Sequence, residues 1–153
     1  MTPTSNPNVL IIDASLMISV CSKEPTAAAV ESALENYALN GWEFFAPNII
    51  VAEVLYILCQ KLQNGLLTPK SYDEAIKNFQ DQMKSIETPN DAQFIKRAKE
   101  IRETYGCSRS SDSIYIALAE NLAKTRTVEL LTFDKGMINQ AAKNAPTVTV
   151  KVL

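Results

Sequence analysis

The chain has 153 residues, which corresponds to a single domain, since domains usually comprise ~100–200 residues. Hydrophobic residues make up 46% and charged residues 21%, values that exclude a disordered or fibrous protein. The 15 basic and 17 acidic side chains exclude a generally basic nucleic-acid clamp, and the absence of histidine excludes Ser-His-Asp catalysis, Cys-His catalysis and zinc sites that use histidine.

The first half of the sequence alternates strand and helix patterns. Residues 1–8 have neither a basic start nor an apolar stretch, so we interpret them as a flexible N-terminal tail, followed by one domain over residues 9–153. The β-branched run Val9–Ile12 predicts a buried strand, and the apolar spacing over 24–40 predicts a helix. The same rules predict a strand at 42–46, a helix from a cap at Asn48 to about 63, and a helix over 69–83.

The second half continues the alternation. We expect strands at 85–88, 128–132 and 148–153, and helices at 91–104, 112–124 and 134–144, with Ser110 or Ser111 capping the second of these helices. Strands that are apolar almost throughout, alternating with helices, are typical of a parallel sheet covered on both faces. The sequence therefore predicts an α/β domain.

Cysteine usage and hydropathy indicate the compartment. Cys21, Cys59 and Cys107 are widely spaced and form no CxxC pair, which favours a reducing, cytoplasmic environment with free thiols. The longest apolar stretch, 49–59, is too short to span a bilayer and contains a glutamate. We therefore expect a cytoplasmic protein with no membrane partner.

Charge is distributed unevenly along the chain. Residues 1–95 carry 5 basic and 11 acidic side chains, whereas residues 96–153 carry 10 and 6. The basic side chains at the start of the second part are Lys96, Arg97, Lys99, Arg102 and Arg109. An anionic partner would dock on this part, and a solvated helix face is the alternative interpretation.

Four acidic residues stand where apolar residues would be expected. Asp13 ends the first strand, Glu53 interrupts an apolar helix, Asp112 precedes another, and Asp134 follows the strand 128–132. An ionised carboxylate in a low-dielectric place is costly unless it is compensated. Ligands of parallel sheets bind beyond the carboxyl ends of the strands. Asp13 and Asp134 would meet there if the strands that precede them are neighbours, and the helix starts near Glu53 and Asp112 approach the same region. Such a cluster without histidine is typical of a site for Mg²⁺ or Mn²⁺.

Each acid also has a structural explanation. Asp112 would satisfy the dipole and the free N–H groups of its helix, and Asp134 would cap the last helix. Asp13 would be a turn residue. Glu53 is the hardest to explain in this way, because its helix is apolar on most sides.

These residues resemble the PIN-domain nucleases, and among them the small VapC-type toxin ribonucleases. The resemblance rests on the order of Asp13-Ala-Ser15, Glu53, the segment Ser111 to Glu120, and Leu130-Leu-Thr-Phe-Asp134. It extends from Val9 to about Val152 and implies a three-layer α/β/α fold with a central parallel sheet of about five strands. It also implies metal-dependent endonuclease activity on RNA, carried by the acidic cluster of Asp13, Glu53, Asp112 and Asp134.

The resemblance also suggests roles for neighbouring side chains. Ser15 and Thr132 match hydroxyl residues that orient a carboxylate or a water, although helix capping and an ordinary strand position are the alternatives. Asp13 and Asp112 would be the principal ligands of Mg²⁺ or Mn²⁺, with Asp134 acting through water. Arg109 would hold a substrate phosphate, or be a surface charge.

This chain departs from the family pattern at several positions. Many relatives carry a further acid where this chain has Gly136, which weakens the case for a second metal. Residue 113 is Ser instead of the common Ala, and residue 111 is Ser instead of a bulkier residue. We interpret Glu120, two turns beyond Asp112, as structural.

Partners follow from the resemblance alone. It implies an RNA substrate, in single-stranded or loop form because a duplex hides its bases, a cognate antitoxin protein, and a homodimer. Two other classes of protein stay open: a catalytically inactive PIN fold that binds RNA or protein, and a phosphoryl-transfer enzyme or receiver. The latter lacks the expected acids, since Ser15 and Ile11-Ile12 stand in their places.

Overall fold

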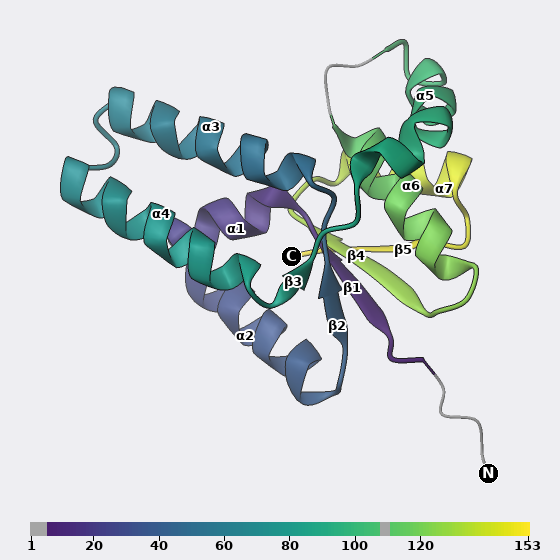
Figure 1. Cartoon of the computed structure of the whole chain (residues 1–153), viewed down its shortest axis with the longest axis horizontal. Helices are drawn as coiled ribbons and strands as arrows, with labels where there is room; N and C mark the ends of the chain where they lie inside the picture. The colour runs from purple at the N-terminus through teal and green to yellow at the C-terminus, as the bar shows by residue number, and fades with distance from the viewer. Residues whose placement is uncertain (1–5, 108–110) are drawn as a thin grey trace.

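A five-stranded sheet forms the centre of the computed structural model, which describes residues 6–107 and 111–153. Its strands are β1 (Val9–Ile12), β2 (Glu43–Phe45), β3 (Ile86–Glu87), β4 (Val128–Thr132) and β5 (Thr149–Val152). All neighbouring strands are parallel, in the order β3-β2-β1-β4-β5 (Figure 1). The predicted parallel α/β fold is confirmed.

Helices cover both faces of the sheet, as Figure 1 shows. One face packs against α1 (Ala14–Cys21), α2 (Ala27–Leu39), α3 (Ile49–Gln63) and α4 (Pro69–Met83). The other packs against the 3₁₀ turn η1 (Asp91–Phe94), α5 (Ile95–Glu103), α6 (Asp112–Ala123) and α7 (Gly136–Asn144). The result is the three-layer α/β/α arrangement that was predicted.

The position of β1 at the centre of the sheet explains why its sequence is apolar throughout. Leu10 and Ile12 pack into the core on the α1–α4 side, whereas Val9 and Ile11 pack into the core on the α5–α7 side. All four side chains are fully buried. Because successive side chains of a strand point to opposite faces, a strand with helices on both sides needs an unbroken apolar run.

The capping of α3 and the extent of α5 differ from the sequence prediction. Asn48 lies at the start of α3 but its side chain caps nothing. Instead the carboxylate of Asp91 accepts the backbone N–H groups of Asn48 at 2.7 Å and Ile49 at 2.9 Å, from 43 residues further along the chain. Unlike a neutral amide, a carboxylate also interacts favourably with the positive end of the helix dipole. The expected helix over 91–104 is divided into η1 and α5.

No helix within the described ranges has the length and apolarity needed to cross a membrane. Cys21 is buried, Cys59 and Cys107 are exposed, and all three carry free thiols.

Candidate active site

The carboxyl ends of β1 and β4 bring two of the predicted acidic positions to one edge of the sheet. The two strands are neighbours, with Ile12 opposite Leu131. The pairing continues one step further, because the backbone N–H of Asp13 donates to the carbonyl of Leu131 at 3.1 Å. Asp13 therefore lies beside Thr132, and Thr132 precedes Asp134 by two residues.

Two hydroxyl groups hold the carboxylate of Asp13. The Thr132 Oγ1 hydroxyl donates to Asp13 Oδ2 at 2.6 Å, and the Ser15 Oγ hydroxyl donates to the same oxygen at 2.9 Å. The Asp13 residue is only 9% exposed and Thr132 is fully buried. Ser15 lies inside α1, which begins at Ala14, so its hydroxyl supports the carboxylate and does not cap a later helix start.

Burial is the largest influence on Asp13. It raises the pKa of the carboxyl group above its ordinary value, because the charged form has lost most of its water. The hydrogen bonds from Thr132 and Ser15 oppose this shift, and the negative charge of Glu53 adds to it. Glu53 is thus close enough to Asp13 for the two carboxylates to repel each other.

Thr132 joins two parts of the site through one hydroxyl. Its Oγ1 donates to Asp13 and also accepts the backbone N–H of Asp134 at 3.0 Å. We expect Thr132→Val, which keeps the shape and removes the hydroxyl, to lower the free energy of unfolding by about 1–3 kcal/mol, because it leaves the buried Asp13 carboxylate and the partly buried N–H of Asp134 without this partner. Urea unfolding would measure the loss. Thr132→Ser keeps the hydroxyl and should lose less, and equal stability of the valine and wild-type proteins would contradict the prediction.

Glu53 is held by residues on both sides of Asp112. The Ser111 Oγ hydroxyl donates to Glu53 Oε2 at 2.5 Å, and the Tyr115 hydroxyl donates to Glu53 Oε1 at 2.9 Å. Ser111 stands at the N-cap position of α6 without capping it, so its hydroxyl serves Glu53 instead of the helix. Burial, followed by the charges of Glu53 and Asp13, raises the pKa of Tyr115 far above its ordinary value.

The remaining two acids have partners of their own. The side-chain amide of Gln140, on α7, donates to Asp112 Oδ2 at 3.1 Å. The backbone N–H of Gly136 donates to Asp134 Oδ1 at 2.8 Å, so one oxygen of Asp134 makes the capping contact that its position suggested. A Cβ atom at residue 136 would lie 3.1 Å from that oxygen, so any other residue there would require the Asp134 carboxylate to move slightly.

The structure links some of the four acids to one another. Asp13 and Glu53 interact electrostatically, and Asp112 heads the helix whose Tyr115 binds Glu53. Over residues 6–107 and 111–153, no three acidic, cysteine or histidine side chains form a group placed to hold a metal ion. Arg109 and Ser110 lie outside the described residues.

The donor chemistry nevertheless suits a hard divalent cation. All four side chains offer carboxylate oxygens, the ligands that Mg²⁺ and Mn²⁺ prefer. Burial and the nearby charge of Glu53 raise the pKa of Asp13, because both make its charged form unfavourable. A bound cation would offset this unfavourable charge.

Sequence reasoning missed two residues of the site. Tyr115 follows Asp112 by three residues, a spacing that places both on one side of a helix, and this signal was available in the sequence. Gln140 carried no such signal, because its contact with Asp112 depends on how α7 packs beside α6.

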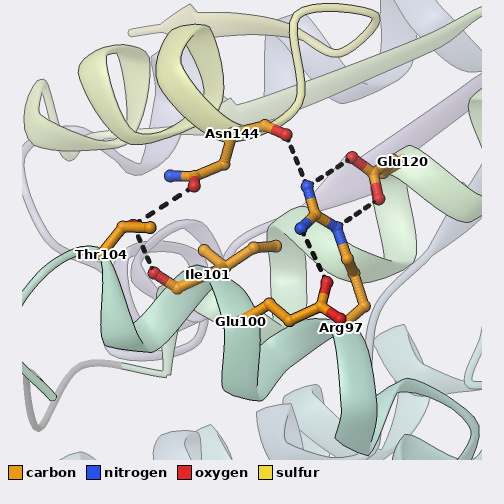
Figure 2. A network of polar contacts seen from close by, with 6 residues as sticks. All are labelled: Arg97, Glu100, Ile101, Thr104, Glu120 and Asn144. Carbon is orange, nitrogen blue, oxygen red and sulfur yellow. Dashed lines mark hydrogen bonds and ion pairs between the residues drawn. The ribbon is translucent and has the colours of Figure 1, made fainter.

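Part of the predicted basic surface is neutralised within the fold. Figure 2 shows the Arg97 guanidinium between α6 and the end of α7. Its Nε and one terminal nitrogen donate to the two oxygens of Glu120 at 2.6 and 3.0 Å, and it also donates to the Asn144 carbonyl at 2.6 Å and to Glu100 at 3.1 Å. Lys99 pairs with Glu103 on the same helix. The structural interpretation of Glu120 agrees with this geometry.

Comparison with known proteins identifies the family of this fold. The PIN domain family model matches residues 10–144, whereas comparison with curated proteins gave no match. Among solved structures, the chain is similar to VapBC2 from Rickettsia felis, crystallised with a DNA fragment from the promoter of the complex, with 15% identity and a TM-score of 0.64. That match covers 94% of this chain and 98% of the other. Since the family model spans most of the sequence, this chain belongs to the PIN domain family.

Proposed function

We propose that this protein is a metal-dependent endoribonuclease that hydrolyses phosphodiester bonds of RNA. The observation that carries the proposal is the Asp13 carboxylate, which is buried at the carboxyl end of the central strand beside Glu53. Holding two carboxylates together in a place poor in water costs free energy. A bound cation would compensate this cost, because it attracts both carboxylates.

Mg²⁺ or Mn²⁺ is the proposed cofactor. Asp13 and Asp112 would hold it directly and Asp134 through water, while Glu53 completes the ligand set or orients the attacking water. When bound, such a cation lowers the pKa of a water and stabilises the charge that develops on the phosphoryl group.

The protein's own contribution is to fix these groups in place. Thr132 and Ser15 orient the Asp13 carboxylate, and Arg109 would bind a substrate phosphate. We propose single-stranded or loop RNA as the substrate, since its bases are accessible.

We further propose that the protein is the toxin of a toxin–antitoxin pair and acts in the cytoplasm. The similar Rickettsia felis structure is a VapBC2 complex, which supports an antitoxin partner for this chain. A homodimer follows by the same analogy. The free thiols of Cys21, Cys59 and Cys107 agree with a reducing compartment.

End-mapped cleavage of total cellular RNA, with Mn²⁺ or Mg²⁺, tests the activity. We expect new RNA ends that require the metal and disappear in Asp112→Asn. Asp81→Asn is the matched control, because Asp81 is an exposed carboxylate on α4 that pairs with Lys84, just beyond the end of the helix, and this variant should cleave like the wild type. No metal-dependent ends from folded wild-type protein would refute the nuclease and favour the inactive, RNA- or protein-binding form of the fold.

A further inference from the structure

Tyr115 places a polar hydroxyl in a largely apolar core. The side chain is fully buried on α6 and packs among apolar residues that include Ile11 and Leu130. Its hydroxyl donates to Glu53 Oε1 at 2.9 Å. A buried tyrosine hydroxyl requires a partner, and a phenylalanine would supply the same apolar packing without that requirement. The hydroxyl therefore matters for Glu53 more than for the core.

The direction of this hydrogen bond is fixed. A tyrosine hydroxyl carries a proton that it can donate, and the Tyr115 hydroxyl lies 2.9 Å from Glu53 Oε1. An ionised Glu53 can only accept. A charge-assisted bond of this kind is stronger than one between neutral groups.

Together, Ser111 and Tyr115 engage both oxygens of Glu53. Ser111 donates to Oε2 and Tyr115 to Oε1, and the two donors flank Asp112. A glutamate side chain on its own has several rotatable bonds and would sample many orientations. Here the segment that carries one acid of the site also orients another acid, which comes from α3.

We propose that Tyr115, assisted by Ser111, is a positioning residue that holds the Glu53 carboxylate beside Asp13 and so assembles the acidic site before a cation or RNA binds. The inference rests on the proposed metal-dependent function. It concerns a residue that touches neither substrate nor metal and acts only through Glu53.

Mn²⁺ binding without RNA tests the inference directly. Calorimetry on the full chain would compare the wild type with Tyr115→Phe, which removes only the hydroxyl. We expect Mn²⁺ affinity to fall about 10–100-fold, the usual effect of removing a group that supports a metal site. Tyr37→Phe is the matched control: its hydroxyl binds the Glu129 carboxylate, near the other end of β4, and its loss should leave Mn²⁺ affinity unchanged.

A double-mutant cycle separates positioning from general packing. If Tyr115 acts through Glu53, then Tyr115→Phe should change Mn²⁺ affinity less than about twofold in a Glu53→Ala background, because the two effects are not independent. Ser111→Ala should lower the affinity in the same direction as Tyr115→Phe. Circular dichroism would confirm that each variant is folded.

The outcomes distinguish this inference from the proposed function. Mn²⁺ binding by the wild type with unchanged affinity in Tyr115→Phe, or an equal loss in the Glu53→Ala background, would overturn the inference alone. Absence of Mn²⁺ binding by the wild type would overturn both.

Discussion

Replacing Asp13 with asparagine is expected to lower metal-dependent RNA cleavage by more than about 100-fold, because even residues that merely support a metal ligand contribute about 10–100-fold. Asparagine can still accept the hydrogen bonds of Thr132 and Ser15 at Asp13 Oδ2, so the local structure should persist. Single-turnover cleavage of a mapped RNA site measures the loss. Cleavage within tenfold of the wild type would contradict a direct role for this carboxylate.

The same substitution should stabilise the metal-free protein at neutral pH, by on the order of 1–2 kcal/mol, since a buried charge is removed. The pKa of Asp13 is raised in the folded state from an ordinary value of 3.8, so folding favours the protonated form. That contribution to stability is fully present below pH 3.8 and is lost as the pH rises through the folded-state pKa. The advantage of Asp13→Asn should therefore grow from acidic to neutral pH. Urea unfolding in EDTA across this range would show it, and a pH-independent difference would refute the argument.

Replacing Arg97 with methionine should lower the free energy of unfolding by about 2–3 kcal/mol. Methionine retains the apolar stem but leaves the Glu120 carboxylate and the Asn144 carbonyl without their donor (Figure 2). Charged hydrogen bonds in partly buried places contribute about 1.5–3 kcal/mol. For a chain of this length the melting temperature should fall by about 5–10 °C.

Lys99→Met on the same helix is the matched control. Lys99 pairs with Glu103, and the two side chains are 68% and 52% exposed. Exposed pairs one helical turn apart contribute only about 0.3–0.5 kcal/mol, so this variant should melt close to the wild type. Equal losses in the two variants would show that Arg97 is no more than a surface charge.

The elements of the fold could be predicted because local rules determine them. The apolar run Val9–Ile12 requires burial on both faces, and Thr68 with Pro69 begins α4 as expected, with a reciprocal cap between Thr68 and Ser71. Asp13 and Asp134 can share one edge of the sheet because β1 and β4 are neighbours in the structure. The same-edge placement of Asp13 and Thr132 follows from this pairing.

Long-range contacts were beyond local rules. Asp91 caps α3 from a distant segment, whereas local rules point to Asn48, the residue directly before the helix. The sequence places Ser111 at the start of α6. It does not predict that the Ser111 hydroxyl binds Glu53 on another helix. Such contacts depend on how helices pack against one another, which hydrophobic periodicity does not specify.

The Arg97 ion pair has an evolutionary consequence. Asn144 receives Arg97 at the end of α7, and its side-chain amide donates to the carbonyl of Gln140, whose own side chain binds Asp112. A change at Arg97 or Glu120 that moves the end of α7 would therefore be passed on to the side chain that contacts Asp112, one of the proposed metal ligands. Selection on activity should act on this pair as well, so in related sequences positions 97 and 120 should change together, and the loss of one partner should accompany a change at position 140.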